Sequence, residues 1–126
     1  MIFVPSTPYV LNAIGRLLVW FYKGQFLKEQ TYKGLVSRIY WVSKMIPKTA
    51  VGQTFGDYVF IRSDLKNDTV RFRRTQAHEL VHVDQGHRLG WFGMVNIVLY
   101  CYQYIKYGYK NMPLENEARE GELPLQ

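Results

Sequence analysis

Cysteine is nearly absent from this chain, which has one such residue, Cys101, among 126. A single cysteine excludes an intramolecular disulfide, the disulfide scaffold of small secreted proteins, and zinc sites built from spaced cysteine pairs. Any metal in this protein must therefore be held by histidine and carboxylate side chains. Internal repeats and low-complexity linkers are lacking too, and an aromatic content of 16% is too high for a disordered chain. We expect one folded domain over residues 1–126.

Long apolar runs are also lacking. The longest stretch without a charged residue, Leu89–Ile105, has 17 residues and only reaches the lower limit for a bilayer-spanning helix. On a helix, Asn96, Tyr100 and Gln103 share one side, and apolar residues form the other. This pattern predicts a buried amphipathic helix, with contact to a membrane as the alternative. Because two prolines interrupt the uncharged first 15 residues, no signal peptide is predicted and a cytoplasmic location is expected.

The net charge of +6, from 16 basic and 10 acidic residues, is unevenly distributed. Residues 115–126 carry Arg119 against four glutamates, so the rest of the chain is more basic than the total indicates. Its lysines and arginines are scattered, and scattered basic residues usually form a solvated surface. Specific binding of nucleic acid is therefore not expected. The same charge would favour peripheral contact with an anionic membrane or envelope surface.

The hydrophobic pattern predicts an α+β fold that is mainly helical, with a β-hairpin or small sheet before the helix that carries the motif described below. Helical spacing predicts helices over residues 11–27 and Tyr32–Met45, within an N-terminal helical segment at residues 1–46. The β-branched and aromatic runs on either side of Gly56 and Asp57 predict a hairpin over residues 48–62.

Helices are predicted again in the C-terminal half. One covers Thr75–Arg88, and the next covers Trp91–Tyr107 and ends at Gly108. Pro113 suits the first turn of a short last helix over residues 113–121.

An HExxH pattern at residues 78–82 lies in the predicted helix Thr75–Arg88. At about 100° per residue, His78 and His82 lie about 40° apart around the helix and one turn along it. Both imidazoles can therefore reach one metal ion, which makes the pattern a specific indication of a metal site.

Other residues of this helix have separate expected roles. Glu79 lies on the flank of the histidine face, where its carboxylate can act as a general base toward a metal-bound water. Leu80 and Val83 lie on the opposite side and are predicted to be buried. His87 lies about 180° from His78. We interpret it as a surface or core histidine, with a role as transition-state donor as the alternative.

A catalytic zinc site needs three protein ligands and one open position. A histidine or aspartate six residues after His82 would indicate a metzincin, but position 88 is Arg. The remaining candidates are Glu115 and Glu117, which an intervening helix of about 24 Å could bring back to the site. These two glutamates lie about 200° apart on a helix, so only one of them can face the metal.

Asn116-Glu117-Ala118 resembles the segment that supplies the glutamate ligand in gluzincin-type zinc metallopeptidases. Together with HELVHVDQ at residues 78–85, it also resembles small bacterial proteins of the HExxHxxQ type. The resemblance covers roughly residues 51–119. It implies a compact zincin fold with one Zn²⁺ per chain, His78, His82 and Glu117 as ligands, and Glu79 as base.

The chain departs from the gluzincin pattern at one supporting position. Gluzincins usually place an acid four residues after the ligand glutamate, to orient the first histidine, and here that position is Gly121. Glu120 or Asp84 is then the candidate substitute. Gln85 lies about 20° from His78 on the helix and either donates to a ligand or substrate or is a plain surface glutamine.

Motif and resemblance together predict a zinc metallopeptidase, a hydrolase that acts on a peptide or protein substrate. Tyr107, Tyr109 and His87 are the candidate donors to the oxyanion. An edge strand of the hairpin, Val59–Arg62 or Thr49–Thr54, could pair with an extended substrate. The alternative is a non-catalytic zincin domain that binds a protein partner or an anionic envelope surface.

Overall fold

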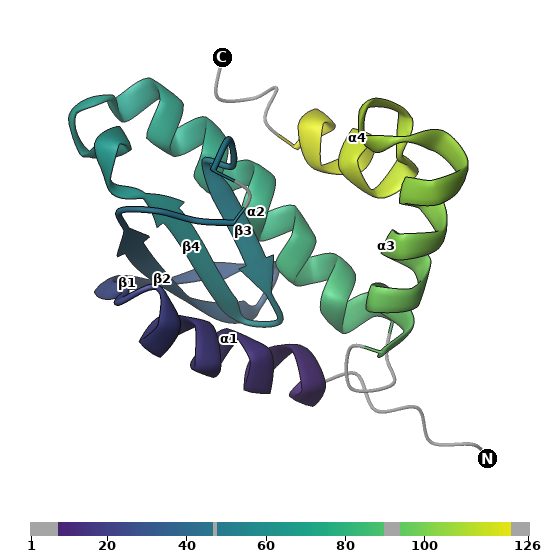
Figure 1. The fold of residues 1–126 in the computed structure, drawn as a ribbon, viewed down its shortest axis with the longest axis horizontal. Helices are drawn as coiled ribbons and strands as arrows, with labels where there is room; N and C mark the ends of the chain where they lie inside the picture. Colours follow the sequence, from purple (N-terminus) through teal and green to yellow (C-terminus); the bar gives the residue numbers. More distant parts are fainter. Residues whose placement is uncertain (1–7, 47, 90–93, 122–126) are drawn as a thin grey trace.

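The computed structural model describes residues 8–46, 48–89 and 94–121. Within them the chain has the predicted α+β fold, in which a four-stranded mixed sheet lies between α1 and α2 (Figure 1). The spatial order of the strands is β1-β2-β4-β3, with β2 and β4 parallel and the other neighbours antiparallel. The strands are β1 (Gln25–Tyr32), β2 (Leu35–Val42), β3 (Gly52–Phe55) and β4 (Tyr58–Arg62).

The helices follow the predicted pattern in the C-terminal half. Asp68 accepts a hydrogen bond from the Arg71 backbone N–H at 3.1 Å and caps α2, which therefore begins earlier than predicted. Gly108 ends α3 with a φ of 73°, as predicted, while residues 91–93 of the predicted helix lie outside the described residues. The helices are α1 (Tyr9–Phe21), α2 (Thr69–Leu89), α3 (Met94–Tyr107) and α4 (Pro113–Glu120), with 3₁₀ turns η1 (Ser63–Asn67) and η3 (Tyr109–Asn111).

The predicted helix Tyr32–Met45 is wrong, because this segment forms β2 and pairs with β1 as a hairpin. Lys33 and Gly34 have φ values of 51° and 78°, which allow the tight turn between the strands. The first helix also ends at Phe21, before the predicted residue 27, and β1 follows it. Strand β2 is paired on both sides and has buried residues on both faces, so its sequence lacks the alternation that identifies a half-exposed strand.

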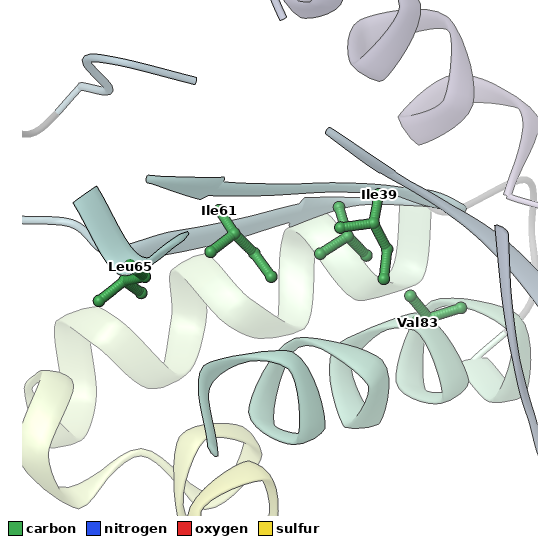
Figure 2. Packing of buried hydrophobic residues seen from close by; sticks show 5 residues of the cluster. Ile39, Ile61, Leu65 and Val83 are labelled. Atoms are coloured by element: carbon green, nitrogen blue, oxygen red, sulfur yellow. The ribbon is translucent and has the colours of Figure 1, made fainter. Parts of the chain in front are cut away.

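The core has two layers, one on each face of the sheet. On one face, Ile39 and Ile61 point toward Val83 of α2 (Figure 2). On the other, Tyr40 and Phe60 pack against residues of α1. Burying each of these side chains contributes about 1.5–3 kcal/mol to stability. Because α2 is fixed to the sheet in this way, it provides a rigid support for the residues on its opposite side.

Helix α3 is oriented differently from the prediction. The polar residue Gln103 faces inward and is buried, whereas the apolar residues Val98 and Ile105 are exposed. The expectation that the apolar side of this helix is the buried one is therefore wrong. Among the described residues, none of the helices combines the length and the apolar character that crossing a bilayer requires.

Candidate metal centre

Helix α2 brings His78 and His82 to one glutamate of α4. The Nε2 atom of His78 lies 2.9 Å from Oε2 of Glu115, and Nε2 of His82 lies 3.1 Å from Oε1 of the same carboxylate. One ligand atom from each of the three residues lies within 4.8 Å of the other two. Two imidazole nitrogens and one carboxylate are the donor set of many catalytic zinc sites, so these residues fit the expected metal.

Glu115, and not Glu117, is the glutamate at this cluster. Helix α4 begins at Pro113, and the Glu115 side chain is buried between the two histidines. Glu117 instead accepts hydrogen bonds from Gln85, at 2.9 Å, and from Arg88. The large angle between the two glutamates around the helix explains why only one of them can face α2. The glutamate that the Asn-Glu-Ala resemblance implies as third ligand therefore differs from the glutamate that lies at the histidine cluster.

Gln85 is a buried support of the cluster. Its amide nitrogen donates to the Leu114 carbonyl and to the Glu117 carboxylate, both at 2.9 Å, and its oxygen lies 2.8 Å from Nδ1 of His82. Since that oxygen can only accept, Nδ1 carries the hydrogen and Nε2 is the nitrogen available to a metal. Gln85 thus orients His82 in the way that acids and carbonyls orient metal-binding histidines.

The position of Glu115 depends on the backbone of its neighbour. The N–H of Leu114 donates to Oε1 of Gln103 on α3 at 3.0 Å, while its carbonyl accepts from Gln85 on α2. Helix α4 is therefore held from two sides at the residue before Glu115. This explains how a helix of only eight residues can place one carboxylate reproducibly.

Glu79 is buried beside the cluster. Its Oε1 accepts a hydrogen bond from Thr54 Oγ1 at 2.8 Å, and its Oε2 lies 4.0 Å from Nε2 of His78. Burial raises the pKa of Glu79, although the two histidines and Thr54 act in the opposite direction. A Cβ at Gly52 would lie 2.8 Å from Thr75 and 3.0 Å from Glu79, so β3 approaches α2 this closely only because that residue is glycine.

The charges of the cluster stabilise one another. Burial disfavours the ionised form of Glu115, but hydrogen bonds from His78 and His82 hold its pKa well below the usual range. Burial likewise disfavours protonation of His82, yet the bond to Glu115 and the nearby Glu79 raise its pKa. The two histidines therefore favour an ionised Glu115, which is the form that can bind a cation.

Two tyrosines lie next to the cluster. The Tyr100 hydroxyl donates to Oε1 of Glu115 at 3.0 Å. Tyr109, one of the predicted donors, lies on the wall of the same cleft, where burial and the neighbouring Glu115 raise its pKa to about 12. Burial raises the pKa of Tyr100 as well, so both hydroxyls keep their hydrogens at neutral pH. Sequence reasoning missed Tyr100 and Thr54, because a tyrosine among ten and a strand threonine carry no motif.

The other predicted residues lie away from the cluster. His87 binds Asp57 at 2.5 Å, and Asn12 binds the same aspartate, so this histidine ties α2 to the β3–β4 turn. Asp84, a candidate support for a histidine, instead pairs with Lys33 and Arg88. Two further candidates, Tyr107 and Glu120, are exposed and are not part of the cleft wall.

A cleft of about 680 Å³ opens over the cluster. Strand β3 forms one wall, and residues of α3 such as Ile97, Tyr100 and Tyr104 form the facing wall. Because β3 pairs only with β4, its other edge is free toward this cleft in the part of the chain that the structure describes. Strand β4 lies between β2 and β3, so the prediction that Val59–Arg62 could be an edge is wrong.

Comparisons with known proteins give no family for this chain: no protein-family model, no curated protein and no solved structure matches it.

Proposed function

We propose that this protein is a zinc-dependent metallopeptidase. The observation that carries the proposal is the convergence of His78, His82 and Glu115 next to the buried carboxylate of Glu79, at the base of an open cleft. Two histidines and a glutamate would hold the ion, with a position left for water or substrate. The resemblance to gluzincins agrees with this set except for the identity of the glutamate.

When bound, zinc would supply a Lewis acid that polarises a carbonyl group and increases the acidity of a water molecule. Glu79 would then act as the base, taking the proton of the attacking water and passing it to the leaving amine. Thr54 would hold the Glu79 carboxylate in position through its hydrogen bond.

The free edge of β3 supports an extended peptide as the substrate. A peptide that lies along Gly52–Phe55 could form main-chain hydrogen bonds with the strand, as in other cases of strand addition. Its scissile carbonyl would then lie over the cluster, where Tyr100 and Tyr109 carry hydroxyl donors. Such donors would stabilise the negative charge that develops on the carbonyl oxygen.

The deciding experiment combines metal analysis with peptide cleavage. We expect about one zinc per chain in protein purified without chelators or a histidine tag, and none in His82→Ala. Glu79→Gln should keep the zinc but lower cleavage by about 10²–10⁴-fold, because it removes only the base. If Glu79→Gln changes no activity of the protein, the catalytic proposal is wrong. Zinc without any cleavage would instead favour a non-catalytic domain that binds a partner.

A further inference from the structure

Helix α3 carries an exposed apolar stripe on the side away from the rest of the molecule. Val98, Tyr102 and Ile105 follow one another at helical spacing and are 63%, 55% and 85% exposed. Contiguous exposed apolar surface of this kind usually marks an interaction site. We call these three residues the α3 stripe.

The inward side of α3 fixes this orientation. Tyr100 donates to the buried Glu115, and Gln103 accepts from the backbone N–H of Leu114. Rotating α3 to bury the stripe would break both hydrogen bonds and leave buried polar groups unpaired. The exposure of the stripe is therefore a consequence of how α3 holds α4 and the metal centre.

The segment that carries the stripe is positively charged. Residues 94–111 contain no acidic residue, and they include Lys106 and Lys110. The Lys106 ammonium lies over the rings of Tyr102 and Tyr107, at 5.6 and 5.2 Å from the ring centroids. Lysines beside tyrosines and an apolar helix face are typical of helices that lie in the interface of an anionic bilayer. A second copy of this chain is a less suitable partner for the stripe than an anionic bilayer, because pairing two stripes would bring the positively charged lysines of both copies together.

We propose that the α3 stripe, with Lys106 and Lys110, is a docking surface for an anionic lipid bilayer. The helix has 14 residues and would lie along the surface, with the stripe among the acyl chains and the lysines at the headgroups. Two residues of α3 that line the cleft, Cys101 and Tyr104, lie on the side of the helix that adjoins the stripe, so docking would bring the cleft close to the lipid surface. The proposal does not depend on metal binding or on catalysis.

Co-sedimentation with vesicles tests this proposal. The full chain should bind vesicles made of equal parts of phosphatidylcholine and phosphatidylglycerol at least about ten-fold more tightly than pure phosphatidylcholine, and high salt should weaken the binding. Ile105→Glu should lower binding to the mixed vesicles by about ten-fold or more, because it places a charge in the stripe. Lys106→Gln combined with Lys110→Gln should remove most of the preference for the anionic lipid.

Val70→Glu is the matched control, because Val70 is 60% exposed on the first turn of α2, where a glutamate is tolerated. It should bind like the unaltered protein, and circular dichroism should show all variants folded. Equal binding to both kinds of vesicle, no binding to either, or unchanged binding by Ile105→Glu would overturn the proposal. So would a dimer that Ile105→Glu dissociates without vesicle binding. Glu79→Gln should dock normally, so failure of the peptidase proposal would be recognised separately.

Discussion

The two sides of α2 are buried by different means. Toward the sheet, Phe72 and Val83 contact an apolar layer that includes Ile39 and Ile61. On the other side, His78 and other polar residues are held by hydrogen bonds and charge. Apolar packing contributes most of the stability and tolerates only substitutions that conserve volume, whereas buried charges contribute little net stability but require defined partners. Stability and chemistry should therefore respond to different substitutions in this one helix.

The largest effect on stability is expected on the sheet side. Ile39→Ala should lower the free energy of unfolding by about 2–5 kcal/mol, because it leaves a cavity in a fully buried layer. Urea denaturation measures the change, and zinc content below the transition should remain normal. Val36→Ala, at an exposed position of the same strand, is the control and should cost less than about 0.5 kcal/mol. A loss of zinc in folded Ile39→Ala would contradict the separation of the two sides.

Glu115 and Glu117 test the cluster side most directly. Glu115→Gln should weaken zinc binding by more than about 100-fold, beyond the range for residues that merely support a ligand. Glu117→Gln should change it by less than about ten-fold, since its carboxylate contacts Gln85 and Arg88 instead. Competition with a chromophoric chelator measures both affinities. The opposite ranking would restore the ligand that the resemblance implies.

Gln85 should have an intermediate effect. Gln85→Met keeps the size of the side chain but removes its three hydrogen bonds, so zinc affinity should fall by about 10–100-fold. The control is Gln76→Met on the same helix, where the buried side-chain oxygen has no hydrogen-bond partner among the described residues. Normal zinc affinity in folded Gln85→Met would show that His82 needs no support from this residue.

The smallest effect is expected at the β3–β4 turn, which His87 links to the C-terminal end of α2. Asn12→Ala removes two hydrogen bonds between Asn12 and Asp57. The backbone N–H of Asp57 donates to the Asn12 side-chain oxygen at 2.6 Å, and the Asn12 side-chain amide donates to the Asp57 carboxylate at 3.1 Å. It should lower stability by about 1–2 kcal/mol, as measured by thermal denaturation, and leave zinc affinity unchanged. A change in zinc affinity would mean that the β3–β4 turn is coupled to the cluster.

Several features were predictable because local chemistry decides them. The hairpin at Gly56, the last helix at Pro113 and the burial of Leu80 and Val83 all follow the prediction. The hairpin of β1 and β2 was missed, since Leu35, Ile39 and Val42 fit helical spacing while belonging to a strand with buried residues on both faces.

Within the candidate site, the motif identified two histidines and the buried Glu79 but could not choose between two glutamates. That choice depends on the rotation of α4, which the hydrogen bonds of the Leu114 backbone set. The orientation of α3 was predicted wrongly for a related reason. The hydrogen bonds of Tyr100 and Gln103 outweigh the stability that α3 would gain by burying its apolar side.

The sequence by itself determined that His78 and His82 lie on one face of a helix with Glu79 beside them, because helix geometry alone sets such neighbours. Only the tertiary structure decided which glutamate completes the cluster and which side of α3 faces solvent. Those outcomes depend on partners far apart in the chain, such as Gln85 with Leu114. Residue spacing within one helix cannot predict such contacts. The rotation of one helix against another is set by the contacts between them and not by the 3.6-residue period of either helix.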